Sequence, residues 1–243
     1  MSTDQKLSPA PDVENVHYVD GVGTNFLFRG AQPLLGSGSY TFNCAGLKSA
    51  LGKAAAAAGV TLPGDYRFIV VNLMQWANED EIPKILAERQ FFLDHPHLGD
   101  FFFWDTSGTE LCALSEPLCN EVVRTYLAMN LDGWLGDQLV ARTETLREML
   151  LLPQVPTVVY AHCNAGDDRT GEMMGAYYLR WMNKSWKEVN VLNRKYAGLP
   201  FGCSNYRATQ WYGLYLLCTY QYALDMSEAF ECKNGTRPEV ACK

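Results

Sequence analysis

The stretch of sequence that decides the fold is residues 162–171, which read His162-Cys163-Asn164-Ala165-Gly166-Asp167-Asp168-Arg169-Thr170-Gly171. Before it, residues 155–161 form a short run rich in β-branched residues, which is typical of a buried strand. After it, residues 172–181 continue as a helical pattern. Residues 162–171, called the signature segment below, are therefore predicted to join the C-terminal end of a strand to the N-terminus of a helix.

A loop at such a junction is suited to bind an anion. The free N–H groups of the loop and of the first helical turn point at a common centre, where the helix dipole adds positive potential. Arg169 can offer a planar fork to two phosphate oxygens, and Gly166 lets the backbone turn without a Cβ in the way. Cys163 would lie at the bottom of this cup, where the same N–H groups stabilise its thiolate as a nucleophile. The predicted phosphate-binding residues are Asn164, Ala165, Gly166, Asp167, Asp168 and Arg169.

The pattern resembles the signature loop of the cysteine-dependent protein tyrosine phosphatase superfamily, whose members attack a phosphomonoester to form a phosphocysteine intermediate. Cys163, Gly166, Arg169 and Thr170 match its motif position by position. The turn at residues 29–33, Arg-Gly-Ala-Gln-Pro, is also similar to a strand-closing turn of these phosphatases. The resemblance implies a tyrosine-phosphatase-like enzyme in which Cys163 is the nucleophile and Arg169 binds phosphate. It also implies that Thr170 donates its hydroxyl to the thiolate. By the same resemblance, the reaction is expected to need no metal and no cofactor.

Two other functions use a similar loop. A catalytically dead phosphate-binding module would keep the cup and Arg169 but lack an acid, and a rhodanese-type sulfur carrier would not need Arg169 and Thr170. The presence of Cys163 together with both residues argues against these alternatives. The substrate stays open between phosphotyrosine or phosphoserine proteins and inositol phosphates or phosphoinositides, so a dual-specificity-like or an atypical phosphatase is expected.

Three aspartates are candidates for the general acid that protonates the leaving group. Asp105 ranks first, because it follows an aromatic strand at residues 101–104 and superfamily enzymes carry this acid on a loop after such a strand. The interval from Asp105 to Cys163 is longer than in simple members, so an extra helical insertion is expected before the signature segment. Asp168 ranks second. Asp132, in a turn between two helical patterns, ranks third.

Asp167 and Asp168 are unusual in an anion site, because carboxylates repel phosphate unless they turn outward or are protonated. An aspartate directly before the arginine recurs in the lipid-directed myotubularins and in a bacterial and protozoan group of atypical phosphatases, in some of which it is thought to be the acid. Alternatively, Asp168 bonds loop amides. Asp167 is expected to be a solvated charge at the helix N-terminus.

Length and composition fit one enzyme domain. The chain has 243 residues, of which 48% are hydrophobic, and no long Gly, Pro or Ser linker divides it. The expected division is a flexible tail at residues 1–15, a single phosphatase domain at residues 16–230 and a cysteine-containing tail at residues 231–243. The formal charge of −7 argues against nucleic acid as a partner and favours compact phosphates over a broadly anionic membrane surface.

The order of predicted elements indicates an α/β fold with a central, mostly parallel sheet flanked by helices. Strands are predicted at residues 17–19, 25–28, 67–73, 101–104 and 155–160. Helices are predicted at residues 45–58, 82–93, 116–152 with a break near residue 133, 172–181, 185–195 and 206–224. No transmembrane segment or signal peptide is expected in this chain.

The cysteines leave the cellular compartment open. Beside Cys163 and Cys218, six cysteines remain in loops and in the C-terminal tail, a placement that suits disulfides: Cys44, Cys112, Cys119, Cys203, Cys232 and Cys242. A secreted or lumenal protein fits this set, whereas a cytosolic protein fits the absence of a signal peptide. Zinc is not expected, because the chain has no Cys-x-x-Cys pair.

Overall fold

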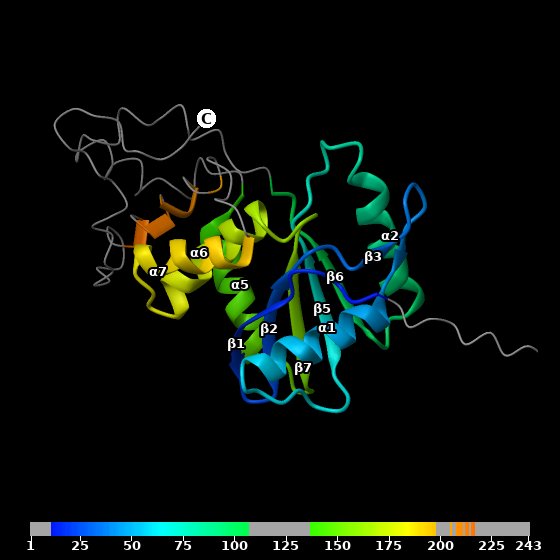
Figure 1. Ribbon diagram of the computed structural model, residues 1–243, viewed down its shortest axis with the longest axis horizontal. Helices are drawn as coiled ribbons and strands as arrows, with labels where there is room; N and C mark the ends of the chain where they lie inside the picture. The colour runs from blue at the N-terminus through cyan, green and yellow to red at the C-terminus, as the bar shows by residue number, and fades with distance from the viewer. Residues whose placement is uncertain are drawn as a thin grey trace, which may run out of the picture.

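The fold is built around a mixed five-stranded sheet (Figure 1). The computed structural model describes residues 11–106 and 137–197, together with residues 205, 208–210, 212, 213, 215 and 216. The strands lie in the order β1-β2-β7-β5-β6, and all neighbours are parallel except β1 and β2. Their bounds are β1 (His17–Val22), β2 (Asn25–Gly30), β7 (Thr157–His162), β5 (Arg67–Asn72) and β6 (Gly99–Phe103). The expected α/β class with a mostly parallel sheet is confirmed.

Helices cover both faces of this sheet (Figure 1). On one face lie α1 (Cys44–Ala57) and α2 (Ile82–Asp94), together with a ribbon formed by β3 (Leu34–Leu35) and β4 (Thr41–Phe42). On the other face lie α5 (Leu139–Leu151) and α6 (Asp168–Trp181), and α7 (Trp186–Ala197) packs against α6. The molecule therefore has three layers, with the sheet in the middle.

The central strand β7 explains why helices are needed on both sides. Val158 and Tyr160 belong to the core under α1, whereas Val159 and Ala161 belong to the core under α5 and α6. Every residue of β7 is buried, and residues 158–161 form an apolar run, as expected for a strand that is covered on both faces. By the same alternation, His162 at the end of β7 lies on the α1 and α2 side.

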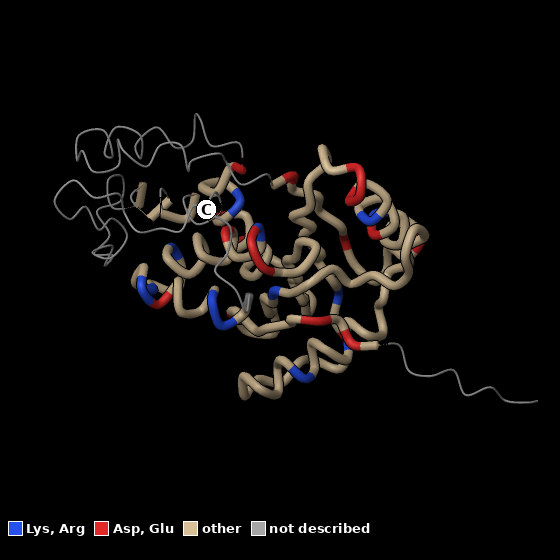
Figure 2. The backbone as a smooth tube through the Cα atoms, turned by 45° about the horizontal axis from the view of Figure 1, so that its top comes forward, with Lys and Arg blue, Asp and Glu red and all other residues tan. Residues whose placement is uncertain are grey.

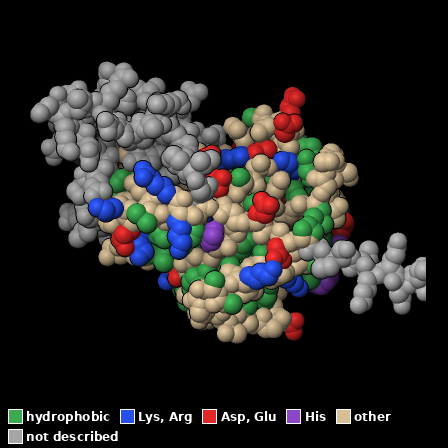
Figure 3. Space-filling view, in the orientation of Figure 1, with side chains coloured by type: hydrophobic (Ala, Val, Ile, Leu, Met, Phe, Trp, Pro, Cys, Tyr) green, Lys and Arg blue, Asp and Glu red, His purple; other side chains and the backbone are tan. Residues whose placement is uncertain are grey.

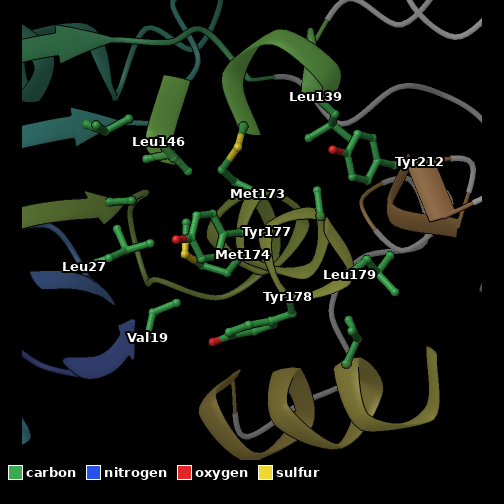
Figure 4. Close-up of a cluster of buried hydrophobic side chains, with 14 of the residues drawn as sticks. Val19, Leu27, Leu139, Leu146, Met173, Met174, Tyr177, Tyr178, Leu179 and Tyr212 are labelled. Carbon is green, nitrogen blue, oxygen red and sulfur yellow. The ribbon is translucent and has the colours of Figure 1, made fainter. Parts of the chain in front are cut away.

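The larger of the two cores surrounds α6 (Figure 4). Every residue of this helix from 170 to 179 is buried, because the sheet, α5, α7 and the side chains of Tyr212, Tyr215 and Leu216 enclose it. Figure 4 shows Met173 and Tyr177 of α6 among Leu27 of the sheet and Leu146 of α5. This enclosure fixes the N-terminus of α6, and hence the signature segment, relative to the sheet.

Several element boundaries differ from the sequence-based prediction by a few residues. The strand before the signature segment begins at Thr157 rather than at residue 155, because Pro156 has no N–H to donate to a neighbouring strand. The helix after it begins at Asp168 rather than at residue 172. A carboxylate in the first turn is favoured by the helix dipole, so Asp168 supports this earlier start.

The predicted helical insertion is described only in its last part. Its C-terminal half contains α5, which packs on β1, β2 and β7. Residues 107–136, which include the candidate acid Asp132, lie outside the described residues. The predicted C-terminal tail at residues 231–243 lies outside them as well.

The last residues of the predicted N-terminal tail pack onto the domain. Val13 is buried, and the carbonyl of Pro11 accepts a hydrogen bond from Asn43 Nδ2 at 2.7 Å. The N–H of Ala31 donates to the Glu14 carbonyl at 3.2 Å. The packed part of the chain therefore begins before residue 16.

Charged residues of both signs are scattered over the described backbone (Figure 2). In the space-filling view, the visible face carries both acidic and basic side chains (Figure 3). Within the described residues, no helix combines the length and the apolar character that a membrane span requires.

Candidate active site

The signature segment lies at the C-terminal edge of the sheet. Cys163 directly follows β7, its exposed fraction is only 3%, and α6 begins five residues later. Arg169, in the first turn of α6, keeps a partly exposed side chain. The structure therefore places the buried thiol of Cys163 and the partly exposed guanidinium group of Arg169 in the same short segment.

The carbonyl groups of this loop are tied to the surrounding protein. The Asn164 carbonyl accepts from the Gln32 N–H at 3.0 Å, the Ala165 carbonyl from Asn15 Nδ2 at 3.2 Å and the Gly166 carbonyl from an Arg29 Nη at 3.0 Å. The backbone N–H groups of residues 164–167 donate to no acceptor within the described residues. Four successive N–H groups at a helix N-terminus are thus left for an anion.

Gly166 is the position at which only glycine fits the loop. Its φ of +82° lies in the left-handed region, and a Cβ there would lie 2.4 Å from the carbonyl carbon of Gly30. The loop therefore turns directly against the end of β2.

We expect Gly166→Ala to distort the loop and to lower both stability and phosphate binding. Strain at positive φ and a backbone clash together cost on the order of 2–4 kcal/mol. Urea unfolding and phosphate binding by calorimetry measure the two effects. Gly38→Ala is the matched control, because Gly38 has a φ of +81° with nothing near its Cβ direction. Equal losses in the two variants would show that the close approach to Gly30 is unimportant.

Arg29 supports the loop from β2. Its side chain is fully buried and donates to the Gly166 carbonyl and, at 2.7 Å, to Asn193 Oδ1 on α7. Its guanidinium also lies 5.3 Å from the ring centroid of Tyr196. The turn at residues 29–33 had been noted in the sequence as similar to a strand-closing turn of phosphatases. The supporting role of Arg29 could not be predicted, because its partners Gly166 and Asn193 lie far away in the sequence.

Arg169 forms a bidentate ion pair with Glu81, which directly precedes α2. Both nitrogen–oxygen distances are 2.6 Å. Burial raises the pKa of the Glu81 carboxyl, but the Arg169 hydrogen bonds and the N–H of Gln75 outweigh it, so the pKa is lowered overall. The pair fixes the orientation of the guanidinium and uses only two of its five N–H donors. Sequence reasoning missed Glu81, which lies far upstream of Arg169.

The side chain of Lys84, in the first turn of α2, also contacts the loop. Lys84 Nζ donates to Asn164 Oδ1 at 2.7 Å and lies 5.6 Å from the ring centroid of Tyr40. Its ammonium group adds positive charge beside the signature segment. Glu81 and Lys84 are three residues apart, so they lie on the same face of α2.

The two acidic residues of the segment differ in their surroundings. Asp167 accepts a hydrogen bond from Asn15 Nδ2 at 2.9 Å. Burial and the neighbouring Asp168 raise the pKa of Asp167 above its ordinary value. Asp168 is exposed in the first turn of α6, so its carboxylate is open to solvent.

Thr170 is fully buried, and its hydroxyl has no hydrogen-bond partner within the described residues. Its bond to the Cys163 thiolate stays a prediction.

Asp105 lies on the loop after β6, at the same edge of the sheet as the signature segment. In the sheet order only β5 separates β6 from β7. The Asp105 side chain is exposed, and its Oδ1 accepts from the Trp76 N–H at 3.2 Å. Its carbonyl accepts from Arg142 Nη1 at 3.0 Å. The structure thus places Asp105 at the same edge of the sheet as Cys163, and its role as the acid stays a prediction.

Arg142 also lies beside a pair of buried carboxyl groups. Glu172 on α6 is fully buried, accepts from Asn205 Nδ2 at 2.5 Å and adjoins the buried Asp137. Burial raises the pKa of Glu172 well above its ordinary value and Asp137 raises it further, against the opposing effects of Asn205 and Arg142. Burial beside Asp137 therefore favours the neutral form of the Glu172 carboxyl, and no sequence pattern indicated this pair.

This buried acid predicts a pH-dependent effect of Glu172→Gln. Above about pH 4.3 the unfolded chain gives up a proton that the folded chain keeps on Glu172, so stability falls as pH rises toward the raised pKa. A glutamine at position 172 does not ionise in either state, so this decrease in stability with pH is absent from the variant. We expect the variant to match the original chain near pH 4 and then to gain up to about 1.4 kcal/mol per pH unit relative to it. Urea unfolding at pH 4, 5.5 and 7 measures the difference, with the exposed Glu148→Gln on α5 as the control. A difference independent of pH would contradict this account.

The remaining predictions concern metals and cysteines. Within the described residues, no group of three or more His, Cys, Asp or Glu side chains is arranged to hold a metal ion. Cys44, one of the six candidates for disulfides, has a free thiol and is half-buried at the start of α1. The other five lie outside the described residues.

No protein-family model and no curated protein matches this chain. Among solved structures, it is similar to the core catalytic domain of the PP-IP phosphatase SIW14 from S. cerevisiae, with 18% identity, 88% of this chain and 92% of the other covered, and a TM-score of 0.42. It is also similar to a PTP-like phytase from Bdellovibrio bacteriovorus, with 15% identity, 88% and 85% covered, and a TM-score of 0.39. A human tyrosine phosphatase-like serine/threonine/tyrosine-interacting protein shows 13% identity, 76% and 89% covered, and a TM-score of 0.38.

These overlaps are loose, with all three TM-scores below 0.5 and all three identities below 20%. They define neither a substrate nor a catalytic status for this chain, both of which depend on its own residues. The three neighbours are a PP-IP phosphatase, a tyrosine phosphatase-like protein and a PTP-like phytase.

Proposed function

We propose that this chain is a phosphomonoester hydrolase that acts through a phosphocysteine intermediate on Cys163. The observation that carries the proposal is the loop after β7, in which a buried cysteine is followed by four backbone N–H groups that have no acceptor within the described residues and by Arg169. Such a cup stabilises charge on the transferring phosphoryl group without a metal ion. The same N–H groups stabilise the attacking thiolate.

The proposed reaction has two steps. In the first, the Cys163 thiolate attacks phosphorus, the bond from phosphorus to the leaving oxygen breaks, and that oxygen takes a proton from the acid. Asp105 is the first candidate for this acid and Asp168 the second. In the second step, water attacks the phosphocysteine and gives a proton to the carboxylate that the acid has become. The phosphorus–sulfur bond breaks, and inorganic phosphate leaves while the thiolate and the acid are restored. Thr170 eases the departure of sulfur if its hydroxyl donates to it.

The proposed substrates are phosphotyrosine or phosphoserine proteins, or inositol phosphates and phosphoinositides. The net charge of −7 and the mixed charges on the visible surface favour compact phosphates over extended anionic surfaces (Figure 3). Phosphate release from phosphotyrosine and phosphoserine peptides, soluble inositol phosphates and phosphoinositide vesicles tests the proposal and ranks these classes. Phosphate binding without release from any of them would indicate the catalytically dead module instead.

Replacing Arg169 by lysine should lower kcat/KM by about a hundredfold or more. A point charge cannot give two aligned hydrogen bonds to a phosphoryl group, nor can it keep both contacts with Glu81. Steady-state kinetics with an aryl phosphate measure the loss. Arg67→Lys is the matched control, since Arg67 lies exposed at the opposite end of β5. Full activity in Arg169→Lys would contradict the proposed role.

A further inference from the structure

The loop that carries Asp105 is contacted from α5 by one arginine, Arg142. Arg142 Nη1 donates to the Asp105 carbonyl at 3.0 Å and to Thr106 Oγ1 at 3.2 Å. Thr106 is fully buried, and its hydroxyl donates in turn to the Trp104 carbonyl at 2.8 Å. The Arg142 guanidinium also lies 5.7 Å from the centroid of the Trp104 ring. One side chain therefore contacts three successive residues after β6.

The helix alone does not explain a positive charge at position 142. Arg142 lies near the N-terminus of α5, where the helix dipole disfavours a cation. Burial lowers the pKa of its guanidinium from the ordinary value, and neighbouring carboxyl groups, with Asp137 first among them, act in the opposite direction. An arginine stays protonated under these conditions. The groups outside the helix therefore account for a charged side chain in this place.

The side chain of Asp105 is held by a different segment, the loop between β5 and α2. The Trp76 N–H donates to Asp105 Oδ1 at 3.2 Å, and the preceding N–H, of Gln75, donates to Glu81 Oε2 at 2.7 Å. Glu81 is the partner of Arg169. Two neighbouring N–H groups thus connect the Asp105 carboxylate to the residue that orients the proposed phosphate-binding arginine.

The main chain of Asp105 depends on Arg142 instead. Within the described residues, no backbone N–H donates to the Asp105 carbonyl. Its bond from Arg142 ties the loop to α5, whose buried side chains pack in the larger core. The position of a proton donor matters, because a displacement of about 1 Å can cost about a hundredfold in rate.

We propose that Arg142 is a positioning residue that fixes the loop after β6, so that the Asp105 carboxyl stays where it can protonate the leaving oxygen. Arg142 acts through the main chain of Asp105 and Thr106, and not on the substrate itself. The inference rests on the proposed function and on Asp105 as its acid.

The sharpest variants are Arg142→Met and Arg142→Lys. Methionine keeps much of the length of the side chain but donates no hydrogen bond, whereas lysine keeps a charged donor. On an alkyl phosphate, whose leaving oxygen needs the proton, Arg142→Met should lower kcat by about tenfold or more with little change in KM. On an activated aryl phosphate the loss should be about twofold or less. Arg142→Lys should recover part of the activity on the alkyl phosphate.

Arg147→Met is the matched control on the same helix. Arg147 is also partly buried, pairs with Asp20 at 2.9 Å and lies 5.5 Å from the centroid of the Trp181 ring. None of these partners belongs to the loop after β6, so this control should not distinguish the two substrates. Equal losses on both substrates in Arg142→Met, or no recovery in Arg142→Lys, would overturn the proposal.

A double variant tests whether Arg142 acts through Asp105. In the Asp105→Asn background, adding Arg142→Met should lower the rate on the alkyl phosphate no further, because the acid is already absent. A second loss of the same size would overturn the proposal. Equal losses on both substrates in an active Asp105→Asn chain would also overturn it, but would leave the proposed hydrolase standing.

A measurement without substrate separates the two proposals further. The Trp104 N–H donates to the Asn72 carbonyl at 2.9 Å, and the Leu73 N–H donates to the His162 carbonyl at 2.7 Å at the same edge of the sheet. In Arg142→Met, amide hydrogen exchange followed by NMR should be about tenfold faster at Trp104 and unchanged at Leu73. An unchanged rate at Trp104 would overturn the proposal. Faster exchange at Trp104 in a chain that releases no phosphate would refute the proposed hydrolase and retain Arg142 as the residue that fixes this loop.

Discussion

Cys163→Ser should reduce phosphate release to the background rate, a loss of roughly 10⁴-fold or more. Serine is nearly the same size as cysteine, but its hydroxyl is not ionised at neutral pH and is a much weaker nucleophile than a thiolate. The loop N–H groups and Arg169 are unchanged by the substitution, so the variant should still bind phosphate.

The measurements are phosphate release, phosphate binding by calorimetry and trapping of a phosphorylated enzyme by rapid acid quench. Only the original chain should yield a phosphorylated peptide, and that peptide should contain Cys163. Cys44→Ser is the matched control, because Cys44 is the other free thiol within the described residues and lies at the start of α1. Full activity in Cys163→Ser, or activity that requires an added divalent metal, would refute nucleophilic attack by Cys163.

Asp105→Asn should cost about 10²- to 10³-fold on an alkyl phosphate and little on an activated aryl phosphate. Protonation of the leaving oxygen matters when it departs as a poor alkoxide, and it matters little for a stable phenolate. The substitution is structurally mild, because an asparagine Oδ1 can still accept the hydrogen bond from the Trp76 N–H. Any large loss therefore reports on the proton rather than on the loop.

Asp168→Asn is the comparison that identifies the acid. If Asp105 donates the proton, Asp105→Asn should also flatten the basic limb of the pH profile, whereas Asp168→Asn should lower activity on both substrates alike. Asp168 is exposed in the first turn of α6, and its charge favours that helix start. The reverse pattern would place the acid in the signature segment, and equal losses in both variants would support neither aspartate.

Local sequence was sufficient for most elements of the fold. The β-branched run before Cys163 predicted β7, and the alanine-rich stretch predicted α1, because both patterns depend on neighbouring residues. The pattern Ser185 to Glu188 predicted the start of α7, where Glu188 accepts from the Ser185 N–H at 2.8 Å. The ends of the elements were predicted less well. The strand predicted to end at residue 160 extends to His162, because β2 and β5 pair with it up to that residue.

Sequence by itself also identified the candidate chemistry. A cysteine and an arginine joined by five residues lie at one strand-to-helix junction, so Cys163, Gly166 and Arg169 are brought together by the local turn alone. Residues within one short loop stay close together whatever the rest of the chain does, and a motif of this kind can therefore be recognised without a structure.

The groups that hold this loop were decided only by the tertiary structure. Glu81 pairs with Arg169, and Glu88 pairs with His162, across long stretches of chain. They meet because the strand order places β7 between β2 and β5 and lays α2 over the end of the sheet. A buried carboxylate is recognisable only from its partners, since burial without them would be too costly. The nucleophile thus follows from local sequence, whereas its electrostatic surroundings follow from long-range packing.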